Sequence, residues 1–131
     1  MNSVFRQVGK IDIFVWSAGI SPAISEVKGY GVEEFQRGFD LVVVSAFNAI
    51  QTLLPLAAPN VRVFNISTGI AHMKPIKGLF NYATTNLAAT KLLDYAASET
   101  PALHVVHIQP GVILTEMNAE TGVEDPDERK L

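Results

Sequence analysis

The chain has 131 residues, 48% hydrophobic and 18% charged, so it can bury one core and is not a disordered segment. Its formal net charge of −3 argues against a strongly basic nucleic-acid binder, and without cysteine it has neither disulfides nor a thiolate nucleophile. The first ten residues lack the apolar run of a signal peptide, and no stretch reaches about 18 uninterrupted apolar residues. We expect a soluble, cytoplasmic protein with no membrane or nucleic-acid partner.

The first predicted element is a short strand over residues 11–16, IDIFVW, which ends at Ser17-Ala18-Gly19. Its continuous apolar run is typical of a strand that is buried on both faces. A loop that contains Pro22, Gly29 and Gly31 follows over residues 21–31.

A long helix is predicted from residue 32 to about residue 57. Glu33 and Glu34 stand at its start, where the helix dipole favours anions. Apolar residues then recur at spacings of three and four, which is the helical period. The valine run over residues 42–44 favours a strand locally, but the length of the segment favours a mostly buried helix.

Two further strands and one further helix complete the predicted order. Residues 61–67 form a strand, residues 68–79 a loop, and residues 81 to about 100 a helix that Pro101 ends. Residues 103–109 form the third strand, and a short helix is expected over residues 115–120. Alternation of strands with crossover helices predicts an α/β fold with a parallel sheet.

Ligands on such a sheet bind beyond the carboxyl ends of the strands. In this sequence those ends are residues 17–19, 67–68 and 110–115. The Ser67 hydroxyl and the Tyr82 phenol, if close together, can polarise a carbonyl and transfer a proton. A phenol needs a nearby cation to do this near neutral pH, but the residue four positions on, which shares its helix face, is the uncharged Asn86.

Four segments of the chain, taken in order, resemble the middle of a short-chain dehydrogenase/reductase. WSAGI (16–20) resembles the family's Asn-Asn-Ala-Gly turn, and NISTG (65–69) its catalytic-serine strand. YATTNLAATK (82–91) resembles the Tyr-x-x-x-Lys helix, and QPGVILTEM (109–117) the Pro-Gly-x-x-x-Thr cofactor segment. The resemblance spans roughly residues 10–118.

This resemblance implies a truncated Rossmann-like fold with about three parallel strands and two long crossover helices. Residues 1–122 would form an incomplete NAD(P)-binding domain, and residues 123–131 a charged tail. Ser67 would orient a small carbonyl or alcohol substrate, and Tyr82 would be the acid/base. NAD or NADP would contact a wider set of residues, namely Ala18, Gly19, Tyr82, Pro110, Gly111 and Thr115.

The same resemblance implies a homo-oligomer through the helices near residues 40–54 and 82–98. It also implies that substrate specificity comes from the loops over residues 21–31 and 69–80. Apolar side chains in the second loop indicate an apolar substrate: Ile70, Met73, Ile76 and Phe80.

The departures from the family pattern concern both catalysis and cofactor binding. The family's helix asparagine falls on Val42 and its lysine on Asn86. Lys91 lies about 180° round the helix from Tyr82, so Lys74 and Lys77 are the candidates to replace the lost cation. The glycine-rich phosphate turn is missing, since Gly29-Tyr30-Gly31 lacks its third glycine and follows a loop.

Two functional hypotheses follow, an NAD(P)-dependent oxidoreductase fragment and a degenerate member that associates with itself or a partner without chemistry. Taken alone, Ser67 also suits a strand end, and Tyr82 a packing position. Trp16 either fills space that a cofactor would use or packs in the core. His104 and His107 lie three apart on a strand and so face opposite sides, which argues against a metal site.

Overall fold

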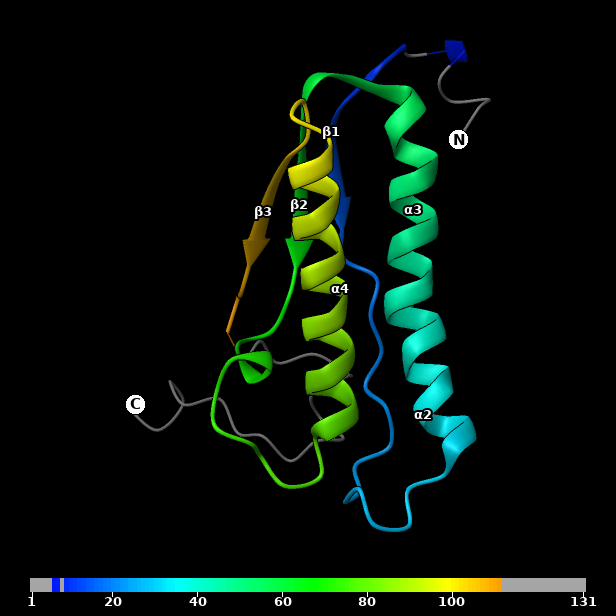
Figure 1. The fold of residues 1–131 in the computed structure, drawn as a ribbon, viewed down its shortest axis with the longest axis vertical. Coiled ribbons are helices and arrows are strands. Elements are labelled where there is room, and N and C mark those ends of the chain that lie inside the picture. The colour runs from blue at the N-terminus through cyan, green and yellow to red at the C-terminus, as the bar shows by residue number, and fades with distance from the viewer. Residues whose placement is uncertain (1–5, 8, 112–131) are drawn as a thin grey trace, which may run out of the picture.

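The computed structural model describes residues 6–7 and 9–111 of the chain. Three strands, β1 (Ile11–Trp16), β2 (Ala57–Ile66) and β3 (His104–Ile108), form one parallel sheet in the order β1-β2-β3 (Figure 1). The predicted α/β fold with a parallel sheet is therefore confirmed. The predicted helix over residues 115–120 and the charged tail lie outside the described residues.

The predicted first helix is one continuous helical segment, Val32–Leu56. It consists of α2 (Val32–Phe39), a π-helical turn η1 (Asp40–Val44), α3 (Ser45–Leu53) and a 3₁₀ turn η2 (Leu54–Leu56). By length and composition this segment is long and apolar enough to cross a membrane, although it contains no uninterrupted apolar run of about 18 residues. The prediction that this helix is mostly buried is wrong, because most of its residues are exposed or partly exposed, but Ile50 and Leu53 lie in the hydrophobic core.

The second crossover helix, α4 (Phe80–Glu99), follows a loop that contains a short 3₁₀ turn η3 (Gly69–Ala71). Both α3 and α4 lie on the same side of the sheet (Figure 1). The main core forms where the two helices meet this face and contains Ile50, Leu53, Val61, Val63, Leu93 and Leu103. Burial of these side chains is the main favourable contribution to folding.

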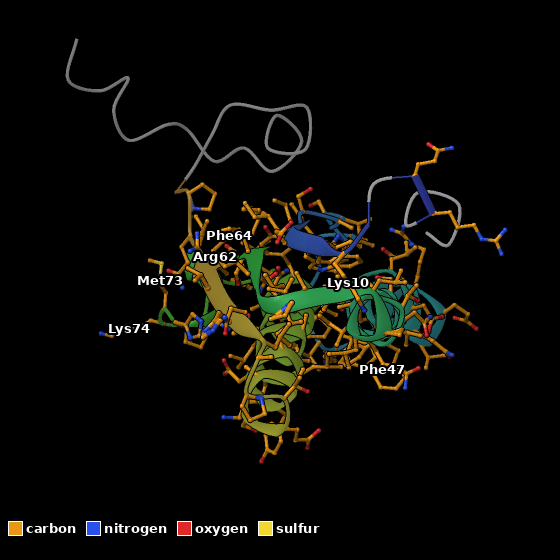
Figure 2. All side chains as sticks on the ribbon, turned by 90° about the horizontal axis from the view of Figure 1, so that it is seen from above. Lys10, Phe47, Arg62, Phe64, Met73 and Lys74 are labelled. Atoms are coloured by element: carbon orange, nitrogen blue, oxygen red, sulfur yellow. The ribbon has the colours of Figure 1, made fainter. Side chains whose placement is uncertain are left out.

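The prediction that β1 is buried on both faces is wrong. Ile13 is 57% exposed and Val15 is 55% exposed, whereas Phe14 packs against the core. β2 alternates in the same way, and Figure 2 shows Phe64 and Arg62 directed away from the helices. Among the described residues nothing covers this second face, so it exposes Ile13, Val15, Val106 and Ile108, with Phe64 and Ile66 partly exposed.

β2 begins at Ala57, four residues before the predicted start. Asn60 adopts a φ of 63°, a left-handed conformation that asparagine tolerates better than most residues. The pairing with β1 slips at this point, from Ile11 opposite Ala57 to Ile13 opposite Arg62. The first four residues of β2 therefore form an irregular start of the strand, which hydrophobic periodicity does not predict.

Candidate functional site

The carboxyl ends of the strands meet at one edge of the sheet, as the parallel arrangement predicts. The Ser67 amide donates to the Ile108 carbonyl at 2.8 Å, so the ends of β2 and β3 lie side by side. A methyl group added at Gly69 would lie 3.5 Å from the Gln109 Oε1. The predicted cofactor residues at this edge are exposed, namely Ala18, Gly19, Pro110 and Gly111, and Thr115 lies outside the described residues.

Ser67 lies at this edge, but its side chain is directed inward. The residue is only 8% exposed, and its Oγ lies 3.2 Å from the Thr90 Oγ1 in the middle of α4. Thr90 follows Tyr82 by eight residues, which is about 12 Å along the helix axis. The hydroxyl contact of Ser67 is thus two turns away from Tyr82, and its role in orienting a carbonyl stays a prediction.

Thr68 is a second hydroxyl at the same edge, and the sequence interpretation gave it no role. It is half-buried, and its Oγ1 accepts from the Ile70 amide at 3.3 Å, which caps η3. Side chains alternate in an extended chain, so Thr68 points away from the side that Ser67 takes. The sequence feature that could have identified Thr68 as a candidate is its place next to Ser67 in the NISTG segment.

Tyr82 lies in the first turn of α4 and is half-buried. Asn86, one turn later, donates its side-chain amide to the Tyr82 backbone carbonyl at 2.9 Å. The side chain at the family's lysine position is therefore used on the helix backbone. It supplies no positive charge to the phenol.

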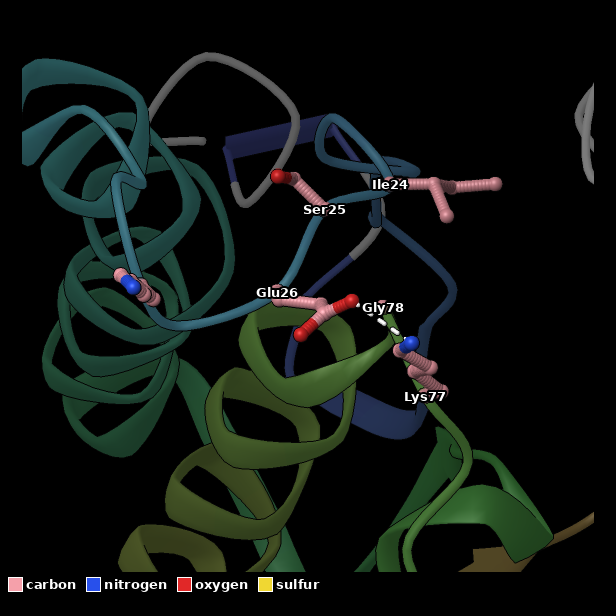
Figure 3. Close-up of a pocket in the computed structure, with 6 residues that line it drawn as sticks. Ile24, Ser25, Glu26, Lys77 and Gly78 are labelled. Carbon is pink, nitrogen blue, oxygen red and sulfur yellow. Dashed lines mark ion pairs between the residues drawn. The ribbon is translucent and has the colours of Figure 1, made fainter.

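The two candidate lysines, Lys74 and Lys77, are directed elsewhere, as is Lys91. Lys77 pairs with Glu26 at 2.8 Å (Figure 3), and Lys91 lies 5.8 Å from the centre of the Tyr95 ring. Lys74 projects from its loop away from the body of the molecule (Figure 2). Neither Lys74 nor Lys77 takes the place of the missing family lysine in this arrangement.

An apolar cluster occupies the space between β1 and the π-helical turn. Val42, Ala46 and Ala89 form its buried centre, and Trp16 and Ile20 pack against it. Trp16 is partly buried and packs against this cluster. Two of the three positions at which the resemblance expects an asparagine, Trp16 and Val42, belong to this one cluster, and the third is Ser17.

The two predicted specificity loops lie against each other. The Ser25 amide donates to the Gly78 carbonyl at 3.2 Å, and Glu26 pairs with Lys77 across the same contact (Figure 3). Gly78 has a φ of +85°, and a methyl group there would lie 2.8 Å from the Ile24 Cγ2. A shallow hollow lies at this junction, lined by Ile24, Ser25, Glu26, Lys28, Lys77 and Gly78.

Glu34 ties the first of these loops to α2. Its carboxylate accepts from the Ala23 amide at 2.9 Å and from two Arg37 nitrogens at 2.7 and 2.8 Å. The hydrogen bond from Arg37 and then that from Ala23 lower the pKa of Glu34 to about 2. The same contact raises the pKa of the Arg37 guanidinium.

These contacts decide whether the described residues fit a nicotinamide cofactor. By the family resemblance the cofactor needs a lysine one turn after the tyrosine, and Asn86 there is bonded to the backbone. The family's helix asparagine is a second polar group that the resemblance expects, and Val42 at that position belongs to an apolar cluster instead. The described residues do not form a complete NAD(P) site.

Residues 1–125 match the family model described as short chain dehydrogenase. An uncharacterized oxidoreductase of Schizosaccharomyces pombe is 23% identical over 118 residues, which are 89% of this chain and 47% of that protein. The structure of a short-chain dehydrogenase/reductase from Serratia marcescens is 26% identical, with a TM-score of 0.80 over 89% of this chain and 48% of that one.

A blue fluorescent protein from a metagenomic library, solved in complex with NADPH, shares the fold at 24% identity. Its TM-score is 0.79, over 88% of this chain and 47% of the other. The chain therefore spans about half the length of the relatives that it matches.

Proposed function

This chain belongs to the short-chain dehydrogenase family, and we propose that its 131 residues act without hydride transfer, by associating with a second copy of the chain. The observation that carries this proposal is the hydrogen bond from Asn86 to the Tyr82 carbonyl. It leaves the phenol without the cation that the family's acid/base chemistry needs. The apolar cluster around Val42 supports the same conclusion at a second catalytic position.

Self-association is proposed through the outer faces of α3 and α4. These helices expose large apolar side chains, including Phe47, Leu87 and Tyr95. Figure 2 shows Phe47 on the side of α3 that points away from the sheet. Exposed apolar surface on a helix face is typical of interaction sites.

Cofactor binding and quaternary structure test the proposal together. We expect no change in NADH or NADPH fluorescence on mixing with the protein at cofactor concentrations up to about 1 mM. A dissociation constant of this size is at the weak end of specific affinities. We expect a concentration-dependent oligomer by sedimentation that survives Ser67→Ala and Tyr82→Phe. Saturable cofactor binding, or a monodisperse monomer at every concentration, would overturn the proposal.

The alternative function is an NAD(P)-dependent oxidoreductase acting on an alcohol or carbonyl. The half-buried Tyr82 at the start of α4 and the exposed Pro110-Gly111 turn favour it. This alternative predicts turnover that falls strongly in Tyr82→Phe, because the phenol would be the proton donor.

A further inference from the structure

A line of five polar side chains connects the strand-end edge of the sheet with the surface beside α4. In order they are Ser67, Thr90, Asn65, His107 and Asp94. The Ser67 Oγ and the Thr90 Oγ1 are 3.2 Å apart, and the Asn65 Nδ2 lies 3.5 Å from the same Thr90 oxygen. The Asn65 Nδ2 also lies 3.0 Å from the His107 Nδ1, and the His107 Nε2 lies 2.9 Å from the Asp94 Oδ1.

Burial makes the direction of each hydrogen bond in this line matter. Ser67, Asn65 and Thr90 are buried, whereas His107 is partly exposed and Asp94 is about half exposed. A buried polar group that loses its partner is costly, so the inner members must change partners together. The outer end at His107 can still exchange a proton with solvent.

The chemistry of the groups fixes one direction when His107 is neutral. An amide nitrogen only donates, so the His107 Nδ1 accepts from Asn65, and the His107 Nε2–H donates to Asp94. The second amide hydrogen of Asn65 points at the Thr90 oxygen. The Thr90 oxygen accepts this bond, so the Thr90 hydroxyl hydrogen stays available to donate to Ser67, whose own proton is then free to point elsewhere.

Protonation of His107 conflicts with this arrangement. A proton on the His107 Nδ1 would face the Asn65 amide nitrogen, so two donors would meet at 3.0 Å. A half-turn of the Asn65 amide removes the conflict, because the carbonyl oxygen then accepts from His107. Thr90 now donates to that oxygen, and Ser67 must donate to Thr90.

We propose that protonation of His107 reverses this hydrogen-bond chain and so sets the direction of the Ser67 hydroxyl. His107 and Asn65 are positioning residues for a hydroxyl at the carboxyl-end edge, and imidazole is the side chain that titrates near neutral pH. Of the described charged groups on the packed elements, Asp94 faces His107. Arg62 of β2 points to the opposite face of the sheet (Figure 2), and Lys91 of α4 lies over Tyr95.

This inference goes beyond the proposed function, because it needs neither a cofactor nor turnover. Its test is NMR spectroscopy of the 131-residue chain alone, following the imidazole nitrogens of His107 and the Cβ resonance of Ser67. At about pH 8 we expect the neutral ring to carry its proton on Nε2. On acidification to about pH 5, the Ser67 resonance should move with the same midpoint as the His107 ring.

Thr90→Val removes the link in the middle of the chain with little change in shape. We expect His107 to titrate in this variant while the Ser67 resonance stays constant, and Thr90→Ser to restore the Ser67 response. Thr84→Val is the matched control, since the Thr84 hydroxyl donates to the Phe80 carbonyl on the same helix and is outside the chain.

His107→Gln tests the hydrogen-bond chain from its other end. It keeps the proposal testable if Thr90→Val does not fold. We expect it to abolish the pH response of Ser67, whereas His104→Gln, on the opposite face of β3, leaves that response unchanged. A Ser67 resonance that does not follow His107 in the wild-type chain overturns the proposal. So does a response that persists in Thr90→Val or His107→Gln, or a neutral His107 protonated on Nδ1.

Discussion

Asn86 and Tyr82 are joined through the backbone, because the Asn86 amide donates to the Tyr82 carbonyl at 2.9 Å. A lysine at this position would carry its charge at the end of a flexible four-carbon side chain, long enough to extend away from the helix backbone. The asparagine folds back along its own helix instead. The side chain at the family's lysine position therefore contacts the helix backbone and not the Tyr82 phenol.

The first prediction is that Asn86→Lys does not create an active reductase. The substitution returns a cation to the helix face of Tyr82, but the apolar cluster of Trp16 and Val42 is unchanged. Gly29-Tyr30-Gly31 also lacks the third glycine of a dinucleotide phosphate turn. Oxidation of NADPH with a panel of small aldehydes and ketones should stay at the rate without protein.

Asn86→Leu is the control for loss of the backbone contact alone. The free energy of unfolding of both variants should lie within about 1 kcal/mol of the wild-type value, because a side-chain hydrogen bond to the i−4 carbonyl contributes little to stability. Measurable turnover in Asn86→Lys, lost again on adding Tyr82→Phe, would contradict the prediction and support the oxidoreductase alternative.

The second prediction concerns the position of the family's helix asparagine. Val42 is 3% exposed in an apolar cluster, so Val42→Asn buries an amide without a polar partner in that cluster. The free energy of unfolding should fall by about 1–3 kcal/mol. Val44→Asn, in the same π-helical turn but at a 46% exposed side chain, is the matched control and should change it by about 0.5 kcal/mol or less.

Urea unfolding of the two variants measures this difference. Equal effects at positions 42 and 44 would mean that the cluster accommodates an amide, and the argument against a polar site there would fail. A gain in cofactor affinity in Val42→Asn would lead to the same conclusion.

The sequence predicted the element order because its signals are local. Apolar runs, helical spacing and the breaks at Gly19, Pro101 and Pro110 lie within a few residues of the elements that they define. The exposed face of β1 was missed because an apolar run has the same appearance whether one face or both faces are covered. Ile13 and Val15 are apolar and exposed, which alternation of residue type cannot reveal.

The side-chain contacts of the candidate site were beyond sequence reasoning for a different reason. Asn65 meets His107 across 42 positions of sequence, and only the strand register brings them together. The inward direction of Ser67 likewise depends on which face of β2 the helices cover. Residue types therefore predicted that the candidate site lies at the carboxyl ends of the strands. Which hydroxyl is accessible there depends on burial, which residue types do not give.

The third prediction concerns the crossing of α2 and α4 at Gly38. A methyl group at Gly38 would lie 2.7 Å from the Asn81 Oδ1 and 2.9 Å from its Nδ2. Asn81 cannot move freely, because its Nδ2 donates to the Tyr30 hydroxyl at 3.1 Å and to the Glu34 carbonyl at 3.3 Å. Gly38→Ala should therefore cost about 1–3 kcal/mol, against the gain that alanine normally gives inside a helix.

Gly31→Ala, at the N-cap of α2, is the matched control. An added methyl group there lies 3.8 Å from the Glu33 Oε2, and φ is −67°, so the change in stability should be small. In the double variant Gly38→Ala/Asn81→Ala the two costs should not add, because the second change removes the atoms in the way. Strict additivity would contradict the assigned contact.

The fourth prediction is a pH dependence of the Glu34–Arg37 contact. Folding lowers the pKa of Glu34 from 4.5 to about 2, chiefly through its hydrogen bond with Arg37. A lowered pKa in the folded state stabilises the fold above the unfolded pKa, and this contribution is lost as the pH falls from 4.5 toward about 2. Glu34→Gln should therefore be less stable than the wild type at neutral pH, and the difference should shrink on acidification.

Glu33→Gln is the control, because Glu33 is a neighbouring carboxylate in the same first turn of α2. Its difference from the wild type should show a smaller dependence on pH over the same interval. Urea unfolding at neutral and acidic pH checks both variants, and a Glu34→Gln difference that does not change with pH would contradict the assignment.

The fifth prediction distinguishes the two apolar surfaces of the molecule. Phe47→Lys places a charge on the outer helix face, where we propose that two copies meet, and should shift sedimentation toward the monomer. Val106→Lys places the same charge on the open face of the sheet, at a residue that is similarly exposed. It should leave the oligomer unchanged, because a charge disrupts association only where it becomes buried. The reverse result, dissociation by Val106→Lys alone, would move the interface from the helices to the sheet.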